Sequence, residues 1–171
     1  MNKSNQYVIF RLDDRRYALY LSAVERIIRS VEITSLPKAP EIVLGIINLE
    51  GQVIPVVNTR KGFMMPERGI GLNDQFIIAR TSNRTIVLTV DSVSGIIASE
   101  EHDMIPSKKI VAGMEYVDGV IKIKDDLILI YDLDRFISFD EDELLDGTIK
   151  QKLDVTAKKR KKKRIQKEAG K

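Results

Sequence analysis

Cysteine and tryptophan are both absent from this 171-residue chain, and His102 is its only histidine. Without cysteine there can be no disulfide, no thiolate nucleophile and no thiolate-ligated zinc or iron–sulfur site. No apolar run approaches the roughly 20 residues that cross a bilayer, and the polar start MNKSNQ lacks the apolar core of a signal peptide. We therefore expect a soluble cytoplasmic protein whose core is drawn from its 43% apolar residues.

Arrangements that could support catalysis are also lacking. His102 is flanked by acids in residues 100–103, but consecutive residues on a polar loop seldom converge on one metal ion. The adjacent acids Asp125 and Asp126 have no nucleophile or base near them in the sequence. We accordingly expect no enzyme activity, no metal and no cofactor.

The net charge of +3 conceals two parts of opposite sign. Residues 152–171 carry ten Lys or Arg against two acids, which leaves 18 bases and 23 acids in residues 1–151. The basic pI therefore belongs to the tail, and the acidic remainder argues against nucleic-acid binding by the folded body. The tail contains seven consecutive bases: Lys158, Lys159, Arg160, Lys161, Lys162, Lys163 and Arg164.

Three roles remain open for this basic run. It contains no aromatic residue and so offers no base-stacking platform, and repulsion between like charges predicts that it is disordered. It could be a solubilising extension, a contact for anionic lipid or nucleic acid, or a tether to an acidic partner. We place one domain over residues 5–146 and the basic tail over residues 147–171.

Short strands separated by tight turns dominate the rest of the chain. Such a series of β-branched and aromatic segments is typical of an all-β barrel or sandwich. The predicted strands cover residues 7–12, 17–21, 45–49, 52–58, 76–80, 85–90, 93–97, 116–123 and 127–131. Because Pro55 cannot donate a ladder hydrogen bond, its strand should lie at a sheet edge or carry a bulge there.

Few helices are expected, and all of them are short. Val24, Ile27 and Ile28 lie at helical spacing. With Ser22 as a cap, they predict a helix over residues 23–29. Two further short helices are expected, over residues 134–137 and 140–145.

Residues 45–58, GIINLEGQVIPVVN, form the most specific pattern in the chain. Gly51 permits a positive φ between two strands, and the Asn48 side chain can bond the backbone near that turn. The stretch resembles the signature of the CheW family, G-x-[IV]-N-L-R-G-x-[IV]-[IV]-P-V-[IV]-[DN]-L-R. Residues 23–27 (AVERI) and 90–96 (VDSVSGI) resemble two other segments of that family, in the same order and at the same spacing.

This resemblance implies two small five-stranded SH3-like barrels packed together, with a few short helices. It also implies a non-enzymatic adaptor that couples chemoreceptors to the regulatory domain of a CheA-type histidine kinase. Such adaptors work in signalling arrays at the inner face of the membrane, and a groove between the barrels takes the receptor tip. The alternative is a nucleic-acid-binding β-barrel protein that uses its basic tail.

The resemblance assigns residues to two contacts. The receptor-binding set comprises apolar groove residues and one charged rim residue: Val24, Ile27, Glu50, Val87, Val93 and Ile96. The kinase-binding side includes Ile110. Plain core packing is the other interpretation of the apolar residues.

Two positions depart from the family signature. Glu50 stands where the family has Arg, and Thr59 stands where it has Leu, whereas Arg60 fits. If the family Arg lies beside acids of the receptor, Glu50 would oppose them at a cost of order 1 kcal/mol, unless the partner has changed its charge. The other interpretation of Glu50 is a solvated turn residue.

Overall fold

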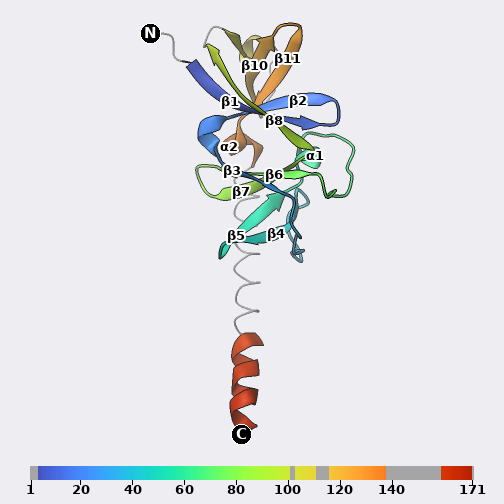
Figure 1. Cartoon of the computed structure of the whole chain (residues 1–171), viewed down its shortest axis with the longest axis vertical. Helices are drawn as coiled ribbons and strands as arrows, with labels where there is room; N and C mark the ends of the chain where they lie inside the picture. Colours follow the sequence, from blue (N-terminus) through green and yellow to red (C-terminus); the bar gives the residue numbers. More distant parts are fainter. Residues whose placement is uncertain (1–3, 101–102, 111–115, 138–158, 171) are drawn as a thin grey trace.

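The computed structural model describes residues 4–100, 103–110, 116–137 and 159–170 (Figure 1). Within these ranges the chain is mostly β-structure, as predicted. The strands are β1 (Ser4–Leu12), β2 (Arg15–Tyr20), β3 (Val24–Arg29), β4 (Val43–Leu49), β5 (Gln52–Val57), β6 (Gln75–Arg80), β7 (Thr85–Val90), β8 (Ser92–Glu100), β9 (Met104–Pro106), β10 (Val117–Ile123) and β11 (Asp126–Tyr131). The short helices are α1 (Thr59–Gly62) and α2 (Leu133–Phe136), with single 3-10 turns η1 (Leu21–Ala23) and η3 (Ser107–Lys109).

The strands form two sheets, one of which is inserted in sequence within the other. One has six strands in the order β8-β1-β2-β11-β10-β9, and the other has five in the order β3-β6-β7-β5-β4. The five-stranded sheet is a continuous stretch of sequence inserted between β2 and β8. Parallel pairing of Leu129 with Tyr17 joins the N-terminal hairpin to β11. The six-stranded count differs from the expected five because the three-residue β9 adds a strand at the edge.

The five-stranded sheet closes on itself where the chain leaves β3. The Thr34 N–H donates to the Ile46 carbonyl at 2.9 Å, and the Ile46 N–H donates back to the Thr34 carbonyl at 2.9 Å. This bridge joins the extension of one edge strand, β3, to the other edge strand, β4. A Cβ on the neighbouring Gly45 would lie 2.2 Å from the Thr34 carbonyl oxygen, so only glycine fits at the closure.

Pro55 is accommodated inside the sheet, so the expected edge position is wrong. Its strand β5 lies between β4 and β7. Pro55 faces Ile46, whose N–H and C=O both point to Thr34 on the opposite side. In an antiparallel ladder this makes Ile46–Pro55 a pair that needs no hydrogen bond, so the missing donor costs nothing towards β4. The register irregularity lies in the partner strand, between Val43 and Gly45.

Residues 24–29 form strand β3, and the predicted helix over residues 23–29 is wrong. Only the 3-10 turn Leu21–Ala23 precedes the strand. The register with β6 shifts between Val24 and Arg26, so the strand carries a bulge. That extra residue breaks the two-residue alternation and leaves an apolar spacing that resembles a helix. Antiparallel pairing with β6 fixes the strand, and β-branched residues suit it.

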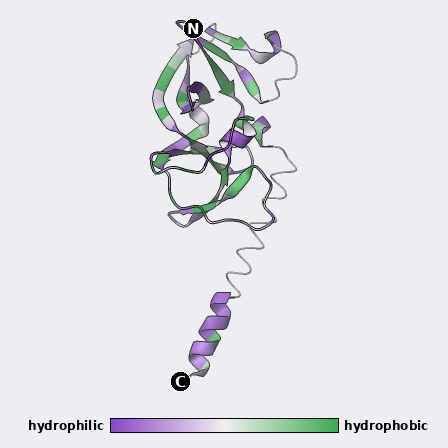
Figure 2. Cartoon of the chain, turned by 90° about the vertical axis from the view of Figure 1, so that its right-hand side faces the viewer, coloured by the Kyte–Doolittle hydropathy of each residue, from purple (hydrophilic) through white to green (hydrophobic). Residues whose placement is uncertain are grey.

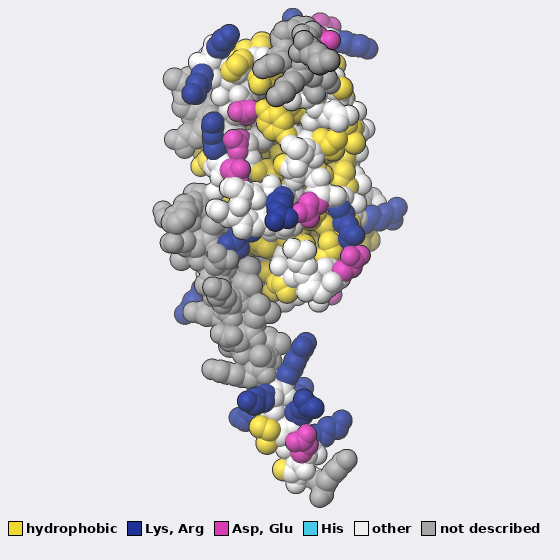
Figure 3. Space-filling view, turned by 90° about the vertical axis from the view of Figure 1, so that its left-hand side faces the viewer, with side chains coloured by type: hydrophobic (Ala, Val, Ile, Leu, Met, Phe, Trp, Pro, Cys, Tyr) yellow, Lys and Arg dark blue, Asp and Glu magenta, His cyan; other side chains and the backbone are white. Residues whose placement is uncertain are grey.

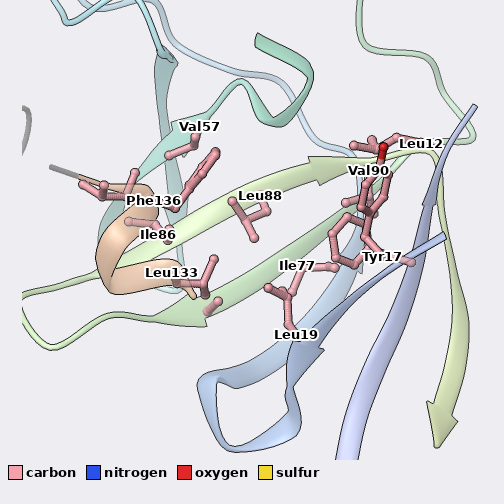
Figure 4. Packing of buried hydrophobic residues seen from close by; sticks show 13 residues of the cluster. Leu12, Tyr17, Leu19, Val57, Ile77, Ile86, Leu88, Val90, Leu133 and Phe136 are labelled. Carbon is pink, nitrogen blue, oxygen red and sulfur yellow. The ribbon is translucent and has the colours of Figure 1, made fainter. Parts of the chain in front are cut away.

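Three clusters of buried side chains form the core. The six-stranded sheet encloses Tyr7, Ile9, Ala18, Ile121, Ile128 and Ile130, and the five-stranded sheet encloses Ile47, Ile54, Val56, Phe76, Ile78 and Val87. The third, here called the shared cluster, comprises Phe10, Leu12, Tyr17, Leu19, Val57, Ile77, Ala79, Ile86, Leu88, Val90, Leu133, Phe136 and Ile137. Figure 4 shows side chains of both sheets and of α2 meeting in it. The two sheets therefore share one hydrophobic interface.

Residues 159–169 form an exposed α-helix, where the sequence predicted disorder (Figure 1). It consists of good helix formers, and Arg164 and Glu168 approach to 4.0 Å at i,i+4 spacing. Figure 2 shows that it is hydrophilic along almost its whole length. Lys158, His102 and the predicted helix over residues 140–145 lie outside the described residues.

Candidate protein-interaction surfaces

The turn between β4 and β5 lies at the centre of the signature stretch. Glu50 and Gly51 have φ angles of +52° and +88°, a combination typical of tight hairpins that match strand twist. The Asn48 side-chain oxygen accepts the Gly51 N–H at 3.0 Å, as the sequence suggested. These residues thus shape the hairpin, and the exposed Glu50 side chain is presented at its tip.

Arg60 fastens the five-stranded sheet to the rest of the fold. Asn58 caps α1 by accepting the Lys61 N–H at 3.2 Å, which places Arg60 in the first turn. The Arg60 side chain is only 8% exposed and donates to Asp13 at 2.9 and 3.0 Å and to Asp91 at 2.8 Å. Asp13 belongs to the β1–β2 turn of the six-stranded sheet, so this cation joins both sheets.

A second arginine extends this network. Arg68 contacts Asp74 at 2.8 Å and Asp91 at 2.7 Å. Hydrogen bonds from Arg68 lower the pKa of Asp74, and those from Arg60 lower the pKa of Asp13. Charges removed from water are tolerated when they are paired in this way. The signature Arg60 is therefore explained by the fold and needs no partner protein.

The residues assigned to a receptor contact divide between surface and core. Val24 and Ile27 lie on β3, and Val93 and Ile96 lie on β8, which are the edge strands of the two sheets. Val24 and Val93 are partly buried and pack against the shared cluster, whereas Ile27 is 37% and Ile96 is 56% exposed. We call these four residues the β3–β8 surface. Val87 is different.

Val87 is wholly buried on β7 inside the five-stranded sheet. Its strand is the middle one of that sheet, paired with β6 and β5. The side chain cannot touch another protein while the barrel is closed, so its assignment to a contact surface is wrong and the core interpretation holds at this position.

Ile110, assigned to the kinase side, lies at the end of η3 and is 45% exposed. Ile105, which the sequence did not single out, is 40% exposed on the adjoining β9. We call this pair the β9–η3 surface. Figure 3 shows exposed apolar side chains interspersed with charged ones on one face of the body. The basic residues 159–164 are exposed on the C-terminal helix.

Comparison with known proteins decides the family. A family model described as CheW-like domain matches residues 6–141. The chain belongs to the CheW family. A chemotaxis protein CheW from Rhizobium meliloti (strain 1021) is 30% identical over 144 residues, covering 83% of this chain and 93% of that protein.

Other CheW proteins agree in fold and sequence. A chemotaxis protein CheW from Thermotoga maritima is 30% identical over 139 residues, covering 79% of this chain and 89% of the relative. The crystal structure of the scaffolding protein TtCheW from Thermoanaerobacter tengcongensis superposes with a TM-score of 0.73 at 30% identity, covering 82% and 96% of the two chains. The resemblance drawn from the signature is thus confirmed.

The first departure from the CheW signature, Glu50, has a local partner. Both terminal nitrogens of the Arg26 side chain lie 3.4 Å from the Glu50 carboxylate. Both side chains are well exposed, so the pair contributes at most about 1 kcal/mol. Arg26 therefore places a positive charge beside Glu50, the position at which the signature has Arg. Nothing in the local sequence pattern links these two residues.

The second departure, Thr59, places a hydroxyl in the core. Thr59 is fully buried, and its Oγ1 has no hydrogen-bond partner among the described residues. A leucine, as in the CheW signature, would leave no polar atom unpaired there. A buried hydroxyl without a partner carries a desolvation penalty.

Thr59→Val should therefore stabilise the protein, because it removes that hydroxyl and keeps the shape. We expect a gain of about 1 kcal/mol in the free energy of unfolding, measured by urea denaturation. Thr89→Val is the matched control, since the Thr89 hydroxyl donates to the Val57 carbonyl at 3.3 Å. Loss of this hydrogen bond should lower the free energy of unfolding. A loss of stability in Thr59→Val would contradict this account.

No metal-binding group of three or more His, Cys, Asp or Glu side chains occurs in the described ranges. In the same ranges, no helix has the length and apolar character required to span a membrane.

Proposed function

We propose that this chain is a non-enzymatic adaptor that couples chemoreceptors to a CheA-type histidine kinase. The observation that carries the proposal is the CheW-like domain over residues 6–141, which covers almost the whole folded body. No catalytic pair was found in the sequence, and the signature residues Asn48, Gly51 and Arg60 are used by the fold. The residues that contact partner proteins must therefore lie on the exposed surface.

The β3–β8 surface is the proposed receptor contact. Its two strands come from different sheets, and Val24 and Val93 both pack against the shared cluster to which both sheets contribute. Ile27 and Ile96 project from it as exposed apolar anchors. A receptor helix with apolar residues at i, i+3, i+4 and i+7 fits such a surface.

Charges around this surface would set the register of the receptor. Arg26 lies next to Ile27 and pairs with Glu50 at 3.4 Å. We propose that this pair replaces the single arginine of the CheW signature at the rim, with Arg26 facing acids of the receptor and Glu50 facing a base. Rim charges of this kind influence association rate and orientation more than affinity.

The β9–η3 surface is the proposed kinase contact. It lies on the strand at the end of the six-stranded sheet opposite β8 in strand order. Two exposed isoleucines there, Ile105 and Ile110, can bury against an apolar patch of the kinase regulatory domain. Contacts on different strands would let one molecule hold both partners at once, in the cytoplasm at the inner face of the membrane.

Each contact can be tested with purified partners from the same cell. We expect saturable binding of the full chain to the regulatory domain of the CheA-type kinase by calorimetry, and to a receptor cytoplasmic fragment by co-sedimentation. Failure of both bindings would remove the adaptor proposal, and failure of one would remove that contact.

A further inference from the structure

The helix over residues 159–169 has no use in the adaptor proposal, and its charge distribution is unusual. Seven of its residues are basic: Lys159, Arg160, Lys161, Lys162, Lys163, Arg164 and Lys167. At about 100° per residue, these bases reach every quadrant around the helix axis. All residues from 159 to 170 are exposed. Figure 3 shows Lys and Arg gathered on this helix.

The Lys and Arg side chains of this helix repel one another when no anion is bound. Lys159 and Lys163, and likewise Arg160 and Arg164, are like charges at i,i+4 spacing, which destabilises a helix. Against them stands the exposed pair Arg164–Glu168 at 4.0 Å. Eleven residues are also fewer than the about 12–15 that an isolated helix needs in water. Anions on several sides would relieve the repulsion.

The composition narrows the chemistry of the anion. A helix that inserts one face into a lipid surface needs an apolar stripe, but residues 159–169 offer only Ile165, which is 58% exposed, and Ala169. An anionic lipid surface would therefore hold this helix by charge alone. Binding to single-stranded nucleic acid relies on aromatic stacking, and residues 159–170 contain no aromatic. Binding to a nucleic-acid duplex requires neither an apolar stripe nor aromatic side chains.

The size and charge of the helix match one groove. An α-helix with side chains is about 10–12 Å across, and the B-DNA major groove is about 12 Å wide with phosphates along both walls. Lys and Arg side chains on every side of the protein helix can then reach the phosphates of both DNA strands. The corresponding groove of duplex RNA is too narrow for a helix. We propose that helix 159–169 binds duplex DNA through its phosphates, without reading sequence.

The test is binding of the full chain to a fluorescent DNA duplex of about 20 base pairs, followed by anisotropy from about 50 to 200 mM KCl. Phosphate contacts release counterions, so log affinity should fall linearly with log salt, with a slope approaching about −6 for seven bases. Two duplexes of unrelated sequence should bind equally.

A matched pair of variants separates the helix from net charge. Replacing Lys159, Lys161 and Lys163 with Gln should make the slope shallower by about 3. Replacing the exposed Arg29, Lys108 and Lys122 of the body with Gln removes the same charge and should leave the slope unchanged. Both variants should unfold at the temperature of the unchanged protein.

Three outcomes would overturn the proposal. One is no binding to the duplex at about 50 mM salt, and another is equal weakening by the body and helix variants. The third is tighter binding at equal salt to vesicles containing anionic phospholipid than to the duplex, which would make the helix a lipid contact. The adaptor proposal stands or falls independently, because its partners are proteins bound by the body.

Discussion

Gly45→Ala should destabilise the protein by about 3 kcal/mol and open the five-stranded barrel. The φ of Gly45 is +154°, and an added Cβ would lie 2.2 Å from the Thr34 carbonyl oxygen and 2.8 Å from the Ile33 side chain. The backbone oxygen cannot give way without breaking the two Thr34–Ile46 hydrogen bonds that close the sheet.

Urea denaturation of the full chain measures this effect, and hydrogen exchange locates it. The Thr34 and Ile46 amides should lose protection first. Gly69→Ala is the matched control, since a Cβ there would meet nothing within 4 Å. Equal stability of the Gly45→Ala and Gly69→Ala proteins would show that the closure is not a tight fit.

Ile96→Asp should abolish most receptor binding and leave the fold intact. Ile96 is 56% exposed, so stability should change by no more than about 1 kcal/mol. An apolar anchor at the centre of an interface is worth about 2 kcal/mol or more, so affinity for a receptor cytoplasmic fragment should fall at least about 30-fold.

Leu127→Asp controls for placing a charge on an exposed strand position. Leu127 is 66% exposed on β11, away from β3 and β8 in strand order. Its variant should bind receptor normally. If both variants lose affinity equally, or if Ile96→Asp unfolds, then the β3–β8 surface is not the receptor contact.

Most strands could be predicted from the sequence because β-branched segments and turn residues are recognised within a few neighbouring positions. The hairpin of β6 and β7 follows from two β-branched segments around a polar turn, and the turn at Gly51 follows from Asn48 and the glycine itself. Residues 23–29 failed because a bulge at β3 imitates helical spacing. Only the pairing of Ile27 with Ile77, 50 residues away in sequence, reveals the strand.

The contact surfaces were harder to predict because they depend on assembly. Val87 was assigned to the receptor contact by the family resemblance, and its burial appears only when β7 is placed in the middle of its sheet. The pairing of Arg60 with Asp13 and Asp91 spans 47 and 31 residues of sequence. No spacing rule links such residues, so the fastening between the two sheets appears only when the barrels are packed.

Simultaneous binding is the most direct test of the adaptor account. The full chain, the regulatory domain of its CheA-type kinase and a receptor cytoplasmic fragment should be mixed and analysed by size-exclusion chromatography with light scattering. The account predicts one complex that contains all three proteins and that loses the receptor, but not the kinase domain, with Ile96→Asp. Mutually exclusive binding of receptor and kinase domain would contradict it.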